Sequence, residues 1–291
     1  MFNHILLATD GSEKARWAGV SAIEIAKEFD SCLTVIHVTP CASLLESWVE
    51  PHDGRQRELK EQQGKNALCE FTHLAEGTQI AYRTVAASGH PMEKIVHAAK
   101  TTGADLIVIG GCGAGGFKSL LRGGGVADGI LHHAPCPVLI VRGPQRAGEM
   151  FQNILVAADG SQCAIKASQT AAGIAKKFAS RVTIVNVFQT PLYADPYGAV
   201  AFCGAGDPLV DQLQESAVRS AALALDGQGT PYCCRKETGF PGSDIVRVAC
   251  EEGCDLIVMG SRGLAGLKAF LLGCVSDRVA HSARGSVLIV K

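Results

Sequence analysis

The segment Ile5-Leu-Leu-Ala-Thr-Asp-Gly-Ser12 decides the fold, because it returns as Ile154-Leu-Val-Ala-Ala-Asp-Gly-Ser161. Each copy is an apolar run typical of a β-strand, followed by a turn that carries an aspartate. Two further blocks repeat near the end of each copy: Asp105-Leu-Ile-Val-Ile-Gly110 with Asp255-Leu-Ile-Val-Met-Gly260, and Val138-Leu-Ile-Val141 with Val287-Leu-Ile-Val290. The repeat predicts two tandem domains, at residues 1–146 and 147–291.

Apolar β-rich runs alternate with helical patterns through both copies. In the first copy we expect strands at 3–9, 33–38, 79–85, 104–109 and 137–142, and helices at about 13–29, 56–75, from Pro91 and at about 126–133. The runs 105–109 and 255–259 are continuously apolar, which is typical of parallel strands covered on both faces. We therefore predict an α/β fold of two doubly wound domains, each with a five-stranded parallel sheet in the order 3-2-1-4-5 and helices on both faces.

A glycine-rich segment follows the fourth strand of each copy, at the sheet edge where doubly wound folds bind ligands. In the second copy Gly260-Ser-Arg-Gly263 is followed after nine residues by Gly273-Cys-Val-Ser276, and we expect a helix from about Asp277. The first copy keeps this spacing but has one extra glycine in Gly123-Gly-Gly125. A glycine loop that enters a helix surrounds an anion with N–H groups, so this segment predicts a phosphate site, better formed in the second copy.

Simpler structural roles compete with ligand binding at several of these residues. We interpret Ser12 and Ser161 as N-caps of the helices that follow them. Asp10 and Asp159 fit a turn as well as a contact to a nucleoside. The glycines also fit a tight connection that has no ligand.

The paired motifs, Thr9-Asp-Gly-Ser12 with Gly110-x2-Gly113-x9-Gly123 and Ala158-Asp-Gly-Ser161 with Gly260-x2-Gly263-x9-Gly273, resemble the universal stress protein family in its tandem form. The resemblance covers nearly the whole chain. Members of the ATP-binding branch carry this glycine spacing followed by Ser or Thr, and bind ATP or AMP at the carboxyl edge of the sheet. The resemblance therefore implies a stress-response regulatory module that binds ATP or AMP, with Mg²⁺ as a candidate companion ion.

Carried over residue by residue, the resemblance implies that Asp159 and Val187 border the adenine and ribose. The residues implied around the ribose and phosphates are Gly260, Arg262, Gly263, Gly273, Cys274, Val275 and Ser276. The first copy would use Asp10, Val38, Gly110, Gly113, Gly123 and Gly124 in the same way. Cys274 in the second copy and a glycine in the first replace the family's hydroxyl, which is a better phosphate donor than a thiol.

The composition and net charge limit the kinds of partner and the cellular location that we expect. The chain has 291 residues, 47% of them hydrophobic, and a net charge of −1, which gives no electrostatic reason to expect nucleic acid or an anionic membrane as a partner. No apolar run reaches the length of a membrane-spanning helix and no secretory signal is evident, so we expect a cytoplasmic protein. The twelve cysteines are mostly expected as small core residues.

Two alternatives to a nucleotide-binding module remain open. One is a dimeric scaffold without nucleotide, and the other is a thiol redox sensor that uses Cys112, Cys274 or the pair Cys233-Cys234. No Ser-His-Asp or Cys-His set recurs in both copies, so we expect no catalytic residues, no metal site and at most slow ATP hydrolysis. The apolar strands Val138–Val141 and Val287–Val290 would be exposed sheet edges, so we expect self-association through them, with a homodimer of the chain as a further candidate.

Overall fold

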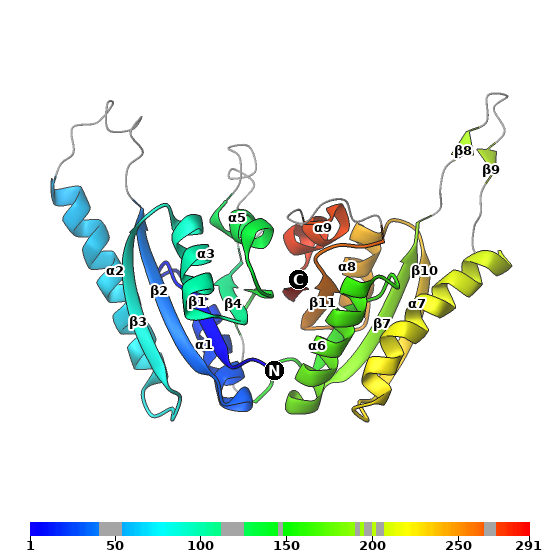
Figure 1. The fold of residues 1–291 in the computed structure, drawn as a ribbon, viewed down its shortest axis with the longest axis horizontal. Coiled ribbons are helices and arrows are strands. Elements are labelled where there is room, and N and C mark those ends of the chain that lie inside the picture. The colour runs from blue at the N-terminus through cyan, green and yellow to red at the C-terminus, as the bar shows by residue number, and fades with distance from the viewer. Residues whose placement is uncertain are drawn as a thin grey trace. The chain divides into compact units, whose positions relative to one another are not determined.

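A computed structural model of the chain describes residues 1–40, 54–111, 125–144, 148–189, 193–194, 200–201, 207–264 and 272–291. They form two compact units, Met1–Glu149 and Met150–Lys291. Each unit contains a parallel sheet with helices packed against it (Figure 1). The α/β class predicted from the sequence is therefore confirmed.

The first unit contains these described elements: β1 (His4–Ala8), α1 (Glu13–Phe29), β2 (Cys32–Pro40), α2 (Gly54–Ala75), β3 (Tyr82–Gly89), α3 (Pro91–Thr102), β4 (Leu106–Gly110), α5 (Val126–His133) and β5 (Val138–Val141). Its sheet has the order β3-β2-β1-β4-β5, with all described pairings parallel. Helices α1 and α2 pack together, as do α3 and α5, so that the two pairs cover opposite faces of the sheet.

The second unit repeats the plan with β6 (Asn153–Ala157), α6 (Gln162–Phe178), β7 (Arg181–Phe188), β8 (Tyr193–Ala194), β9 (Val200–Ala201), α7 (Pro208–Asp226), β10 (Tyr232–Thr238), α8 (Pro241–Glu251), β11 (Leu256–Gly260), α9 (Cys274–Ser282) and β12 (Ser286–Val290). Its sheet has the order β10-β7-β6-β11-β12, and the short β8 and β9 pair with each other. Both sheets therefore have the predicted order 3-2-1-4-5.

The repeated polar residues at the strand ends shape the turns. The Oγ atoms of Ser12 and Ser161 accept hydrogen bonds from the amides of Ala15 and Ala164 at 3.2 and 3.1 Å, which confirms both serines as N-caps. At the opposite edge of the second sheet, the Asp255 carboxylate accepts from the Gln152 amide at 2.8 Å. Asp105 does the same for the Asn3 amide in the first unit, at 2.7 Å. The repeated aspartates before β4 and β11 therefore fasten the starts of β1 and β6.

Two predicted boundaries were wrong. The third strand lies at Tyr82–Gly89 rather than 79–85, because it pairs with β2 along the whole stretch from Leu33 to Pro40 and extends as far as that partner. The helix expected near Asp277 begins at Cys274, because the Asp277 amide already closes the first turn onto the Gly273 carbonyl at 2.9 Å. Most of residues 39–56 and 189–208 lie outside the described residues.

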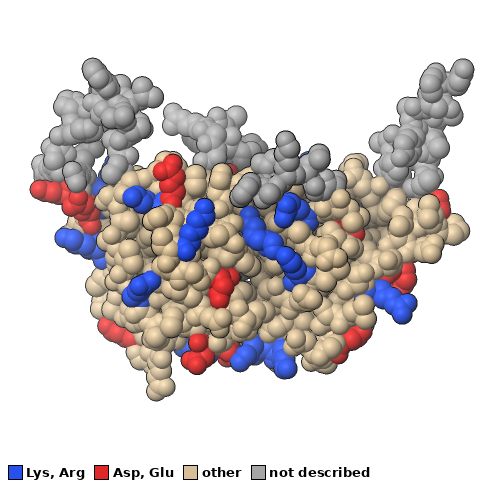
Figure 2. Space-filling view, in the orientation of Figure 1, with Lys and Arg blue, Asp and Glu red and all other residues tan. Residues whose placement is uncertain are grey.

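The surface carries no single-sign patch on the face that Figure 2 shows, where acidic and basic side chains of the described residues are interspersed. In the part of the chain that the structure describes, no helix is long and apolar enough to cross a membrane.

Candidate functional site

The ends of β6 and β11 meet through the Asp159 carboxylate in the second unit. Its Oδ1 accepts from the Ser161 amide at 2.9 Å, and its Oδ2 accepts from the Leu264 amide at 3.1 Å. The Ser161 hydroxyl also lies 3.5 Å from the Arg262 carbonyl. Residues about a hundred positions apart are thus joined at the carboxyl edge of the sheet, where the strand order reverses.

Protein neighbours restrict the space at two of the motif glycines. A Cβ on Gly260 would lie 2.7 Å from Cys163 Cβ and 2.8 Å from the Cys163 carbonyl carbon, so this glycine lets α6 approach β11. A Cβ on Gly263 would lie 2.5 Å from the Asp159 Oδ2 atom. Backbone packing therefore explains the glycine at position 260, whereas a side chain at position 263 would displace the Asp159 carboxylate from the Leu264 amide.

Gly273 differs from these two glycines. It is the N-cap of α9 with φ −71°, a conformation open to any residue. A Cβ there would come no closer than 3.4 Å to Ser261 O and Ser276 Oγ, which is ordinary contact. Among the motif glycines whose surroundings are described, Gly273 is the one that neither strain nor close packing explains.

The start of α9 is fastened to the loop after β11 by the Ser261 carbonyl. That oxygen accepts from the Gly273 amide at 2.8 Å and from the Ser276 hydroxyl at 3.0 Å. Ser276 is 2% exposed, and its hydroxyl also lies 2.9 Å from the Gly273 carbonyl. Its side chain therefore holds the loop against the helix, and what it can offer an anion is its backbone N–H.

The first turn of α9 has amides without a side-chain acceptor, because its N-cap is a glycine that makes no side-chain cap bond. Cys274, the first helical residue, is exposed, and Val275 is half-buried. Within the described residues the half-buried Arg262 guanidinium has no ion-pair partner. These amides, the positive end of the helix dipole and one unpaired cation are the elements that bind an anion.

Val187 lies at the end of β7 and is half-buried. The residue before it, Asn186, is 7% exposed and donates from Nδ2 to the Ala158 carbonyl at 2.7 Å. This bond joins β7 to the residue that immediately precedes Asp159. Val187 and Asp159 therefore belong to one connected edge of the sheet.

The first unit has the same arrangement where it is described. Asp10 accepts from the Ser12 amide at 2.9 Å, and Val38 is buried at the end of β2. A Cβ on Gly110 would lie 2.7 Å from the Lys14 carbonyl carbon, so this glycine has the same packing role as Gly260. The predicted ligands Gly113, Gly123 and Gly124 lie outside the described residues.

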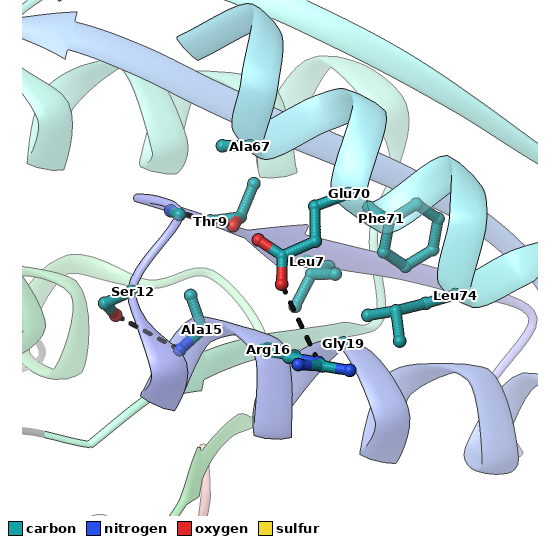
Figure 3. A pocket seen from close by; sticks show the side chains of 11 residues that line it. Leu7, Thr9, Ser12, Ala15, Arg16, Gly19, Ala67, Glu70, Phe71 and Leu74 are labelled. Carbon is teal, nitrogen blue, oxygen red and sulfur yellow. Dashed lines mark hydrogen bonds and ion pairs between the residues drawn. The ribbon is translucent and has the colours of Figure 1, made fainter. Parts of the chain in front are cut away.

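A small hollow in the first unit lies between α1 and α2 rather than at the glycine loop (Figure 3). Leu7, Phe71 and Leu74 form its apolar side, and the Arg16–Glu70 ion pair, 3.7 Å between Nε and Oε1, lies at its rim. It holds about 10 Å³, room for roughly one water molecule. It is too small for a nucleotide, so we do not include it in the candidate site.

The model of the Universal stress protein family matches residues 1–142 and again residues 150–291. The chain belongs to the universal stress protein family. The universal stress protein MJ0531 of Methanocaldococcus jannaschii is 34% identical over 152 residues, which cover 50% of this chain and 85% of that protein. A universal stress protein of Mycolicibacterium smegmatis is 26% identical over 299 residues, covering 99% of this chain and 96% of its own length.

The fold agrees with that of a solved relative. The crystal structure of a universal stress protein from Archaeoglobus fulgidus has a TM-score of 0.74 and 24% sequence identity, and the match covers 99% of this chain and 96% of that one. This likeness extends over both units and concerns the fold alone.

Sequence reasoning missed part of this universal stress protein's edge. It did not single out Asn186, its twin His37, or the Ser261 carbonyl that anchors α9. One signal was present, because each of Ile36-His37-Val38 and Val185-Asn186-Val187 places a polar side chain inside an otherwise apolar strand end. A hydrogen bond through a main-chain carbonyl such as that of Ser261 has no such sequence signal.

The expectation that the cysteines are mostly core residues was wrong, because six of the nine described cysteines are exposed and only Cys136 of these nine is buried. The pair Cys233-Cys234 gives little support to the redox alternative. Cys233 and Cys234 are consecutive in β10, so their side chains point to opposite faces of the sheet. Partial burial raises the pKa of the Cys234 thiol, and burial raises the pKa of Cys254 to about 12. Cys112 lies outside the described residues.

The raised pKa values predict slow alkylation, because the thiolate is the reactive form. We expect Cys254 to resist iodoacetamide at pH 8 in the folded protein and to react fully after denaturation, with Cys234 modified more slowly than a free cysteine. Peptide mass spectrometry of protein labelled for increasing times measures this. Rapid native labelling of Cys254 would contradict its assignment as a half-buried, protonated thiol.

Proposed function

We propose that this universal stress protein binds an adenine nucleotide, ATP or AMP, at the carboxyl edge of its second sheet and acts as a regulatory module. Asp159 and the main chain at Val187 would contact the nucleoside. The amides of Cys274, Val275 and Ser276, together with Arg262, would bind the phosphates. In the first unit, Asp10, Val38 and the loop from Gly110 would form a second site.

Gly273 carries this proposal. Protein neighbours restrict the space at Gly260 and Gly263, whereas a side chain at Gly273 would meet no atom closer than 3.4 Å. Gly273 is a glycine that the fold does not require, and it lies at an uncapped helix start near Arg262, which has no ion-pair partner among the described residues. A phosphate that approaches its backbone closely would explain it. The proposal thus rests on space that the folded chain leaves unused.

The Gly273→Ala variant distinguishes an effect on nucleotide affinity from an effect on the stability of the fold. The added methyl group fits the protein but would meet the phosphate, so we expect the affinity for ATP and AMP at this site to fall about tenfold or more, equivalent to about 1.4 kcal/mol. The free energy of unfolding without nucleotide should change by no more than about 1 kcal/mol, since only an N-cap is altered. Isothermal titration calorimetry and urea unfolding measure the two quantities.

Gly227→Ala is the matched control, because its Cβ would also make ordinary contact, 3.7 Å from Leu223 O, and it lies at the end of α7. It should leave nucleotide affinity unchanged. If Gly273→Ala and the unsubstituted protein bind nucleotide with equal affinity, the start of α9 is not the phosphate site.

No described group of three or more His, Cys, Asp or Glu side chains could hold a metal ion, so we assign no residue to Mg²⁺. A cytoplasmic location remains a prediction from the sequence. So does self-association through Val138–Val141 and Val287–Val290, which small-angle scattering of the full chain and of variants with a charged residue in these strands would test.

A further inference from the structure

At the candidate site, the hydrogen-bond ladder between β6 and β7 ends one bond before the position that a regular parallel ladder would reach. The Ala158 amide donates to the Val185 carbonyl at 2.9 Å, as a parallel ladder requires. The next ladder bond would run from the Val187 amide to the Ala158 carbonyl. Within the described residues that carbonyl accepts instead from Asn186 Nδ2, at 2.7 Å.

Because Asn186 occupies the Ala158 carbonyl, the main-chain groups of Val187 that face β6 have no hydrogen-bond partner among the described residues. Successive residues of a strand direct their N–H and C=O groups to opposite neighbours. Phe188 bonds toward β10, since its carbonyl accepts from the Gly239 amide at 2.9 Å, and Val185 bonds toward β6. The N–H and C=O of Val187 therefore point to the β6 side, beyond the last ladder bond.

Asn186 itself is only half satisfied, which indicates that packing alone does not explain it. Its side chain is buried, and Oδ1 has no hydrogen-bond partner. Leaving a buried acceptor unpaired is unfavourable, and an apolar residue of similar size would avoid it. The Nδ2 bond to Ala158 is what the side chain contributes.

In the first unit a different residue, His37, occupies the equivalent main-chain carbonyl. His37 is 6% exposed, its Nδ1 lies 3.0 Å from the Thr9 carbonyl, and its Nε2 has no partner. Thr9 precedes Asp10 just as Ala158 precedes Asp159. The Thr9 amide donates to the Ile36 carbonyl at 3.0 Å, so the ladder stops at the same step.

We propose that Asn186 is a positioning residue of the nucleotide site: it takes the Ala158 carbonyl out of the ladder, so that the Val187 N–H and C=O remain free to bond the edge of a 6-aminopurine. This inference rests on the proposed function. A neighbouring donor and acceptor match the N1 acceptor and 6-amino donor of adenine. The 6-oxo group and N1–H of hypoxanthine present the opposite pattern, so the arrangement selects AMP over inosine monophosphate.

Asn186→Leu tests the proposal, because leucine has a similar size and cannot donate to Ala158. We expect the Val187 amide to exchange its hydrogen faster than the ladder-bonded amides of β7 in the unsubstituted protein, and to become protected in the variant as it pairs with Ala158. We also expect AMP affinity to fall about tenfold and the preference for AMP over inosine monophosphate to approach one. Hydrogen exchange by NMR and calorimetric titration measure these changes.

The first unit supplies a rescue control. The His37 ring lies over Gly64, where a Cβ would be 2.5 Å from Cδ2, and the repeat places Gln214 at the position of Gly64. Asn186→His with Gln214→Gly therefore reproduces the His37 arrangement and should restore both the AMP preference and the free Val187 amide. A purely structural role for Asn186 would lower stability in Asn186→Leu without changing the ratio of the two affinities.

The outcomes separate this inference from the proposed function. A Val187 amide that is as protected as its ladder-bonded neighbours in the unsubstituted protein would overturn the role of Asn186, whatever binds. A free Val187 amide in a protein that binds neither AMP nor ATP would defeat the nucleotide proposal and leave the ladder interruption standing. An AMP preference that Asn186→Leu retains would contradict the positioning role.

Discussion

Gly260→Ala is expected to destabilise the second unit by about 3 kcal/mol, at the upper end of the range for overpacking a core. The methyl group would lie 2.7 Å from Cys163 Cβ and 2.8 Å from a backbone carbon of α6. A helix backbone cannot turn aside as a flexible side chain can, so α6 has to move away from β11. Urea unfolding followed by circular dichroism measures the loss.

Gly273→Ala is the control for this experiment, because it makes the same chemical change thirteen residues later at a position with ordinary contacts. Gly110→Ala should destabilise the first unit in the same way, since its Cβ would meet Lys14 C at 2.7 Å. If Gly260→Ala unfolds at the same urea concentration as the unsubstituted protein, the close approach of α6 to β11 is not a constraint on this glycine.

Gly242→Met is expected to destabilise the contact between α8 and α9 by about 1 kcal/mol, at the lower end of the range for overpacking, because the exposed Arg278 side chain has to move aside. A Cβ on Gly242 would lie 2.5 Å from Arg278 Cδ and 3.0 Å from Arg278 Cγ, because the arginine stem lies across this glycine. The first unit has the opposite arrangement at the equivalent positions, with Met92 lying across Gly129 and its Cγ 2.5 Å from where a Cβ would be. Large and small residues have exchanged places.

Because the large and small residues are exchanged between the two units, a double-mutant cycle can test whether Gly242 and Arg278 compete for the same space. Arg278→Gly alone should cost about 1 kcal/mol as a glycine inside a helix. Combined with Gly242→Met, it recreates the pair found in the first unit, so the double variant should be more stable than the sum of the single effects by about 1 kcal/mol. Strict additivity of the two unfolding free energies would show that the residues do not compete for the same space.

The strand order and the site edge could be predicted because their signals are local. The apolar runs around Ile5 and Ile154 identify the first strands, and Asp10 and Asp159 mark the edge where the order reverses. Ser12 and Ser161 could be identified as caps because a serine before a helical pattern has a specific hydrogen-bonding role.

The role of each glycine could not be predicted, because it depends on residues distant in the sequence. Cys163 restricts the space at Gly260 and Asp159 restricts it at Gly263, and neither neighbour is evident from the glycine spacing. The same holds for Asn186, whose partner is the main-chain carbonyl of Ala158. The motif therefore predicts where the candidate site lies, while the packing role of each residue in it became evident only from the structure.

Native mass spectrometry of the intact chain with added ATP or AMP tests the nucleotide assignment most directly, with Gly273→Ala and Gly227→Ala measured beside the unsubstituted protein. We predict at least one bound nucleotide per chain in the unsubstituted protein and in Gly227→Ala, and one fewer in Gly273→Ala with its fold intact. No nucleotide on any of the three, or equal occupancy on all of them, would contradict the assignment of the start of α9 as the phosphate site.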